Sequence, residues 1–129
     1  MAKRSNPKRQ YPRMVRVNEL LREVVAEALQ DIDDDRLVDV AITNVRCDAD
    51  LANAVVHYDV LAGADADDEV IEAFAELRPR LQAIINRETR MKGTPKLTFA
   101  PDPVVRSAAR IDDVLRGLQG SEPATDPTP

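Results

Sequence analysis

Residues 52–61 read Ala-Asn-Ala-Val-Val-His-Tyr-Asp-Val-Leu, and this stretch decides the fold. Ala54, Val56, Tyr58 and Val60 fall on one face at every second position, and the β-branched content is typical of a half-buried strand. His57 falls on the opposite face. It is the only histidine of the chain, so it has no ligand set for a metal, and we interpret it as a surface side chain.

A second strand is predicted just upstream of this stretch. Val38, Val40 and Ile42 alternate with Asp39 and Ala41, which is the pattern of a strand with one buried face. The polar residues around Asp48 and Asp50 indicate a turn between the two segments. The short connection predicts that the two strands pair antiparallel.

Helices are predicted on both sides of this strand pair, because apolar residues recur there at steps of three and four. Pro79 separates two of these helices, and residues 96–100 alternate as a third strand. The resulting order is helix, strand, strand, helix, helix, strand, helix, which predicts an α+β two-layer sandwich with helices on one face of the sheet. The helical segments are residues 14–29, 70–77, 81–90 and 104–118.

The composition bounds the size and class of the protein. The chain has 129 residues and is 43% hydrophobic, which suits one domain. Aromatic residues make up only 3%, which argues against a base-stacking platform of the RRM or OB type. The single cysteine, Cys47, excludes a disulfide within the chain and a thiolate metal cluster, and we interpret it as a small residue at a strand end.

The termini differ from the central part of the chain. Residues 1–12 are basic and lack helical periodicity, which indicates a flexible arm, and residues 119–129 indicate a disordered acidic tail. Residues 13–118 are then the expected folded domain. No apolar run approaches 18 residues, and no apolar stretch follows the basic N-terminus, so we expect neither a membrane span nor a secretory signal. The expected compartment is the cytoplasm.

Charge is segregated along the sequence. Residues 31–72 carry two basic and thirteen acidic side chains, whereas residues 73–99 carry six basic and two acidic ones. Residues 1–30 are also basic, with seven basic and three acidic side chains. The net charge of −5 therefore does not exclude a nucleic-acid partner, because local fields steer a polyanion. The alternative is a solvated acidic surface with scattered basic residues.

Catalytic chemistry finds no support in the sequence. The carboxylate clusters, such as Asp33 to Asp35, are consecutive and do not converge on one substrate. The four glycines fit no nucleotide-binding fingerprint, and no Ser–His–acid or Cys–His set can be assembled. We therefore expect a binding protein, not an enzyme, without cofactor or metal.

The strongest candidate for an anion site lies at Arg78-Pro79-Arg80. Pro79 suits the first turn of a helix, and a helix starting there would expose backbone N–H groups between two arginines. Arg80 and Arg87 are seven residues apart, hence on one helix face. The alternative is an ordinary bent helix with a charged solvent side. The candidate RNA-binding residues are Arg13, Arg16, Arg78, Arg80, Arg87, Arg90, Lys92 and Lys96.

Several short stretches resemble one known family in order and spacing over about residues 11–115. The chain resembles ribosome-binding factor A. The matching stretches include residues 16–30, Asp35 to Leu37, residues 40–45, residues 50–61, Thr94 to Phe99, and Ala109 to Asp112.

The resemblance implies a type II KH-like fold with a kink between two helices (α-β-β-α-kink-α-β), followed here by the C-terminal helix. Members of the family carry an Ala-x-Gly element at the kink, and Leu77-Arg78-Pro79 departs from it. The resemblance also implies binding to the free small ribosomal subunit and its rRNA, support of late rRNA maturation including the 5′ end, and a link to growth in the cold. An assembly GTPase is an implied neighbour, and a monomer is expected. The competing hypothesis is a general single-stranded RNA module on a KH scaffold, which should carry a Gly-rich backbone clamp that is absent here.

Overall fold

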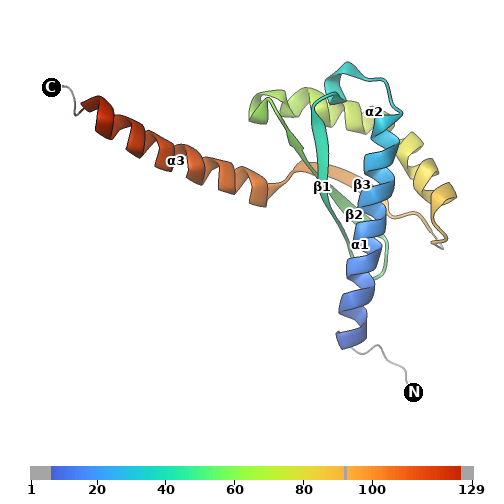
Figure 1. Ribbon diagram of the computed structural model, residues 1–129. Helices are drawn as coiled ribbons and strands as arrows, with labels where there is room; N and C mark the ends of the chain where they lie inside the picture. The colour runs from blue at the N-terminus through green and yellow to red at the C-terminus, as the bar shows by residue number, and fades with distance from the viewer. Residues whose placement is uncertain (1–6, 92, 126–129) are drawn as a thin grey trace.

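The computed structural model describes residues 7–91 and 93–125, with side chains over 12–91 and 93–118. The fold is α+β, with one three-stranded sheet, two helices packed on it, α1 (Pro7–Gln30) and α2 (Asp67–Glu88), and a third helix, α3 (Pro103–Thr125), that extends away from the sheet (Figure 1). Two 3-10 turns, η1 (Asp35–Leu37) and η2 (Gly63–Ala66), precede β1 and α2. The predicted α+β, KH-like class is confirmed.

The sheet has the strand order β1 (Val40–Cys47), β2 (Asn53–Val60), β3 (Lys96–Pro101). β1 and β2 pair antiparallel, as predicted, and β3 runs parallel to β2. β1 begins two residues later than predicted and is longer, with a register shift between Ile42 and Asn44. A bulge of this kind bends the edge of a sheet and limits its pairing with other strands.

The core lies between one face of the sheet and the two helices. On β2 the alternation is as predicted, because Ala54, Val56, Tyr58 and Val60 are buried and His57 lies on the other face. Phe74 of α2 joins this core, with its ring 5.8 Å from that of Tyr58 and stacked 4.3 Å from that of Phe99. Cys47 is buried at the end of β1, as predicted, and burial raises the pKa of its thiol to about 11.

The predicted break at Pro79 is wrong. α2 is one helix from Asp67 to Glu88 with Pro79 inside it, and Figure 1 shows that this helix changes direction along its length. Proline lacks the N–H that would bond the carbonyl of Ala75, so it bends a helix where packing holds both halves in place. Leu81 and Ile85, beyond the proline, are buried with Phe74, which explains why the helix continues.

The helices at both ends of the chain are longer than predicted. α1 begins at Pro7, within the segment expected to be a flexible arm, and α3 continues to Thr125, within the expected disordered tail. Lys, Arg and Gln are good helix formers, which favours the extension of α1. Helix propensity does not explain why α3 continues through Gly120. Residues 1–6 and 126–129 of the two expected segments lie outside the described residues.

The start of α3 is fastened to the sheet at two points. Asp102 is buried and accepts hydrogen bonds from the backbone N–H of Val104 and Val105, and from the hydroxyl of Thr43 at 2.5 Å. One turn later, Arg106 donates two hydrogen bonds to Asp67, at 2.9 and 3.0 Å. These contacts fix the direction in which α3 leaves the sheet.

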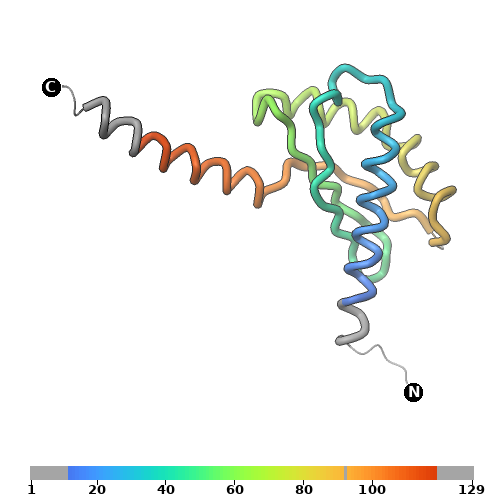
Figure 2. Tube along the Cα trace, in the orientation of Figure 1, coloured from blue at the N-terminus to red at the C-terminus, as the bar shows by residue number. Residues whose placement is uncertain are grey.

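Beyond this anchor the side chains of α3 are exposed as far as Leu118, and Figure 2 shows the helix leading away from the rest of the chain. The sequence predicts this helix from the spacing of its apolar residues, but in the described residues these side chains do not pack on the sheet. The exposed large apolar side chains are Val104, Ile111, Val114, Leu115 and Leu118.

The two anchoring carboxylates make the fold sensitive to acid. Burial, the largest influence, raises the pKa of Asp102, but the hydrogen bonds from Thr43, Val105 and Val104 together bring it below its usual value. Arg106 is the main cause that lowers the pKa of Asp67, and the hydroxyl of Tyr58 adds to it at 2.7 Å. A pKa lower in the folded than in the unfolded chain means that the folded state binds fewer protons on acidification. Stability is then full above about pH 4 and is lost as the pH falls through the folded pKa values.

We expect Asp102→Asn to keep most of the stability at neutral pH and to lose less of it between about pH 4 and 2, because asparagine caps a helix as well as aspartate but does not titrate. Urea denaturation across this pH range measures the difference. The control is Asp65→Asn, an exposed carboxylate of η2. If the free energy of unfolding of Asp102→Asn fell as steeply with acid as that of the natural chain, the proposed role of this carboxylate would be contradicted.

Candidate nucleic-acid interface

The proposed anion-binding corner at Pro79 does not exist. Because α2 is continuous there, the N–H groups after Pro79 lie inside the helix and pair with its own carbonyls. Arg78 and Arg80 are two residues apart on one helix and so point about 200° apart around its axis. Arg78 is half-buried, and its Nε atom is buried without a hydrogen-bond partner among the described residues.

The true N-terminus of α2 does not suit an anion. Its first turn carries Asp67, Asp68 and Glu69, which already complement the positive end of the helix dipole. A phosphate there would meet three carboxylates. The phosphate site that the sequence predicted at a helix N-terminus is therefore found neither at Pro79 nor at the start of α2.

Arg80 and Arg87 lie on one face of α2, as their spacing predicts. Both line a groove of about 470 Å³ between α1 and α2. Glu27 of α1 and Asp31, just after its end, line the same groove, together with Glu88. These carboxylates offset the two arginines, so the groove itself is mixed in charge.

A second set of cations gathers at one end of the sheet. The side-chain oxygen of Asn18 accepts a hydrogen bond from the backbone N–H of Cys47 at 2.8 Å, which places this part of α1 at the end of β1. Arg13 and Arg16 precede Asn18 on α1 and are exposed, and Figure 1 shows α1 extending past the sheet at its N-terminal half.

The other strands bring further cations to the same end. Lys96 is the first residue of β3, is exposed and pairs with Asn53 at the start of β2. Arg90 is exposed on the segment that enters β3. Lys92 lies on the same segment but outside the described residues.

Arg46 belongs to this end of the sheet and was missed by the sequence reasoning. It is exposed on the uncovered face of β1, opposite Val55, which in turn lies opposite Thr98 of β3. Arg46 lies within the acidic stretch of residues 31–72, so the charge pattern did not single it out. Successive side chains of a strand point to opposite faces, so only its position directly before the buried Cys47 would have indicated that Arg46 is exposed. We call Arg13, Arg16, Arg46, Arg90 and Lys96 the basic end.

The acidic residues lie mainly at the opposite end of the sheet, which we call the acidic end. Residues 31–39 lead into β1, and residues 65–69 come shortly after β2, while the register pairs Val40 with Val60 at this end. A strand of eight residues separates the two ends by about 26 Å. This exceeds the Debye length of about 8 Å at physiological salt. A polyanion at the basic end is therefore largely screened from the acidic end.

The main exception is the turn between β1 and β2. Asp48 and Asp50 lie at the basic end, but both are used by the turn itself. Asp48 accepts hydrogen bonds from the backbone N–H of Ala52 and Asn53, at 2.9 and 3.0 Å, and these contacts lower its pKa. These carboxylates hold the hairpin and reduce the positive potential next to Lys96.

Three other features were sought in the described part of the chain: a base-stacking surface, a metal site and a membrane-spanning helix. Tyr58 and Phe74 are fully buried, and Phe99 is partly buried with its ring stacked on Phe74, so these rings offer little stacking surface to bases. Within residues 7–91 and 93–125, no group of three His, Cys, Asp or Glu side chains is placed to hold a metal ion. Among the helices described, none has the length and hydropathy needed to cross a bilayer.

Comparison with known proteins gives the family. The sequence model of ribosome-binding factor A matches residues 13–115. The chain belongs to the ribosome-binding factor A family. The ribosome-binding factor A of Rubrobacter xylanophilus is 38% identical over 103 residues, which cover 79% of this chain and 84% of that protein.

Solved structures of ribosome-binding factor A have the same fold. The crystal structure from Thermus thermophilus has a TM-score of 0.62 at 25% identity and covers 68% of this chain and 94% of that one. A homology model of Thermus thermophilus ribosome-binding factor A, fitted into an electron microscopy map of a complex with the 30S subunit, has a TM-score of 0.55 at 26% identity. It covers 64% of this chain and 88% of that one.

Proposed function

We propose that this chain binds the free small ribosomal subunit or its precursor through the basic end and promotes late maturation of the small-subunit rRNA, including processing of its 5′ end. The observation that carries the proposal is that the fold gathers five exposed cations from α1, β1 and the entry to β3 in a chain of net charge −5. Family membership and the relative fitted into a 30S complex support it.

The proposed action is binding without catalysis. rRNA folds into deep traps, and a protein that binds one local arrangement more tightly than the others shifts the population toward it. Such traps deepen at low temperature, which supports a role during growth in the cold. The chain would act as a monomer in the cytoplasm, with an assembly GTPase as a neighbour on the subunit.

The competing proposal is a general single-stranded RNA module. Such a module needs a backbone clamp or exposed aromatic rings. α2 contains no glycine, and the aromatic side chains of the described region are buried in the core or packed against it. These features favour recognition of a folded rRNA surface.

Removal of the gene from its host tests the proposal in cells. We expect small-subunit rRNA with an unprocessed 5′ end to accumulate, more strongly in the cold, while large-subunit rRNA matures normally. Primer extension measures the 5′ ends. The natural chain should restore processing, and a variant with Arg13, Arg16, Arg90 and Lys96 changed to glutamine should not. Normal 5′ ends in the deletion strain, or equal delay of both subunits, would contradict the proposed role.

A further inference from the structure

A groove of about 490 Å³ lies at the acidic end, away from the basic end. Its apolar lining includes Ala26 and Leu29 of α1, Ile32, and Val40 of β1. Leu29, Ile32 and Val40 are only partly buried against the core. Ligand pockets commonly measure about 300–1,000 Å³, so this groove has room for side chains from a partner.

The groove follows the outer edge of β1. Ala41 and Ile42 both line it, although successive side chains of a strand point to opposite faces of the sheet. Lining by both residues indicates a groove along the edge between those faces. Among the described residues β1 pairs only with β2, so its outer edge is open to another extended segment.

Val38 adds an exposed apolar side chain at the mouth of the groove. It lies in the turn between η1 and β1 and is 72% exposed. The neighbouring Leu37 is buried in the core, so the backbone is held while Val38 projects outward. The fold itself does not use this side chain.

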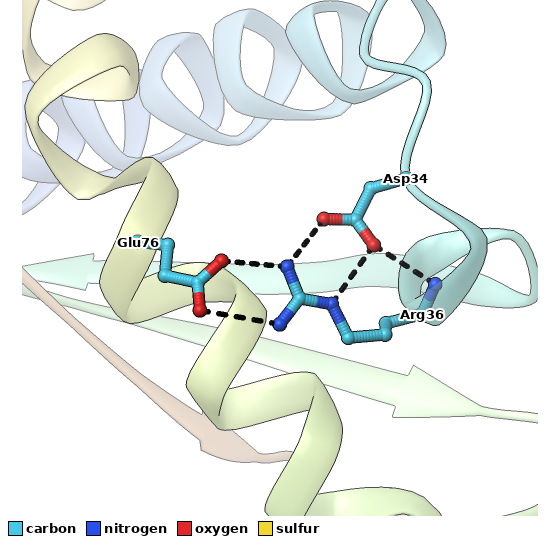
Figure 3. A network of polar contacts seen from close by, with 3 residues as sticks. All are labelled: Asp34, Arg36 and Glu76. Carbon is cyan, nitrogen blue, oxygen red and sulfur yellow. Dashed lines mark hydrogen bonds and ion pairs between the residues drawn. The ribbon is translucent and has the colours of Figure 1, made fainter.

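Arg36 links Asp34, which lines the groove, to α2 (Figure 3). Arg36 donates to both carboxylate oxygens of Asp34, at 3.0 and 2.7 Å, and reaches Glu76 of α2 at 2.7 Å. Asp34 also caps η1 by accepting from the backbone N–H of Arg36. Arg36 holds the pKa of Asp34 and of Glu76 below their usual values, so all three side chains stay charged.

Arg36 is the only basic side chain in residues 31–39, and two carboxylates already hold it. The other carboxylates of this segment are exposed, and no side-chain hydrogen bond or ion pair is seen for them in the described part of the chain. Asp33 lines the groove directly. An apolar floor with uncompensated carboxylates on its rim complements a ligand with apolar side chains and positive charge. The exposed carboxylates on this side are Asp33, Asp35 and Asp39, whereas Asp31 faces the groove that holds Arg80 and Arg87.

We propose that the groove along the outer edge of β1 binds an extended peptide in which lysine or arginine alternates with apolar side chains. The alternation sends apolar side chains into the groove while the cations meet the carboxylates at its rim, and the peptide backbone pairs with β1 as far as the bulge after Ile42. The chain would then hold RNA at one end of its sheet and a basic protein segment at the other.

The test uses the isolated full-length chain and a fluorescent octapeptide of four lysines alternating with Val and Leu, measured by fluorescence anisotropy. Two comparison peptides keep one feature each. The first has Glu in place of Lys and keeps the apolar side chains, and the second has Ser in place of Val and Leu and keeps the positive charge. We expect only the Lys–Val/Leu peptide to bind tightly. NMR shifts of backbone amides should concentrate in residues 32–42. Equal binding of the Lys–Ser peptide would overturn the proposal, because it would show attraction by charge alone.

Matched variants separate this groove from the rest of the acidic surface. Asp33→Asn with Asp35→Asn should weaken binding by about three- to tenfold, whereas Asp65→Asn with Asp68→Asn removes the same charge from exposed residues near α2 and should have little effect. Val38→Ser should weaken binding by about tenfold, and Leu61→Ser, also exposed, should not. Equal losses in a variant and its control would overturn the proposal. No ribosome is present, so the result is independent of small-subunit binding.

Discussion

Changing Arg90 and Lys96 to glutamine is expected to weaken binding to the small subunit by at least about tenfold at physiological salt and to lower its salt dependence. Each neutralised phosphate contributes about 0.7 (single strands) to 0.9 (duplex) to the slope of log affinity against log salt. Loss of two contacts should therefore lower the slope by about 1.4 to 1.8. Arg13→Gln with Arg16→Gln should act similarly, because all four side chains are exposed at the same end of the sheet.

The control is Arg110→Gln with Arg116→Gln, which removes the same charge from exposed positions on α3. Binding titrations at several salt concentrations give affinity and slope together. All three double variants should melt at nearly the same temperature as the natural chain. If the α3 pair reduced affinity and slope as much as the basic-end pairs, the binding would follow net charge and the basic end would not be the site.

Replacing Phe74 with alanine is expected to lower the free energy of unfolding by about 3–5 kcal/mol. Its side chain is fully buried, its ring stacks on Phe99, and it also contacts Tyr58. The change leaves a cavity between α2 and the sheet, where aromatic contacts join the two layers. A loss of this size is a large part of the roughly 5–15 kcal/mol that stabilises a domain.

Urea denaturation measures this effect, and Ile71→Ala is the matched control on the same helix. Ile71 is 40% exposed, so its truncation should cost clearly less than that of Phe74. Equal costs at the two positions would show that the packing of Phe74 does not join the layers as described. Small-subunit affinity of the folded fraction should stay unchanged in both variants, because neither residue lies at the basic end.

Periodicity predicted the parts of the fold in which local pattern and burial agree. β2 alternates strictly, and its buried residues are those that the sequence placed on one face. β1 was harder to place, because the bulge after Ile42 changes which residues face the core and Val38 is apolar but exposed. A single sequence carries no local signal for either feature.

The candidate site was only partly predictable. The sequence around Pro79 suits both the start of a new helix and a kink inside a continuous one. Which of the two forms depends on the tertiary packing of Leu81 and Ile85. Arg80 and Arg87 share a face because helix geometry requires it. Arg46 joins Lys96 only through the register of three strands, which one sequence does not state.

Sedimentation of the purified chain with small subunits, large subunits and an unstructured RNA of similar charge tests most directly whether this protein is a small-subunit binding factor. The basic end and the lack of an exposed stacking surface in the described region predict tight binding to free small subunits, loss of that binding at high salt, and weak binding to the other two. Equal affinity for the unstructured RNA, or for both subunits, would contradict the proposed function.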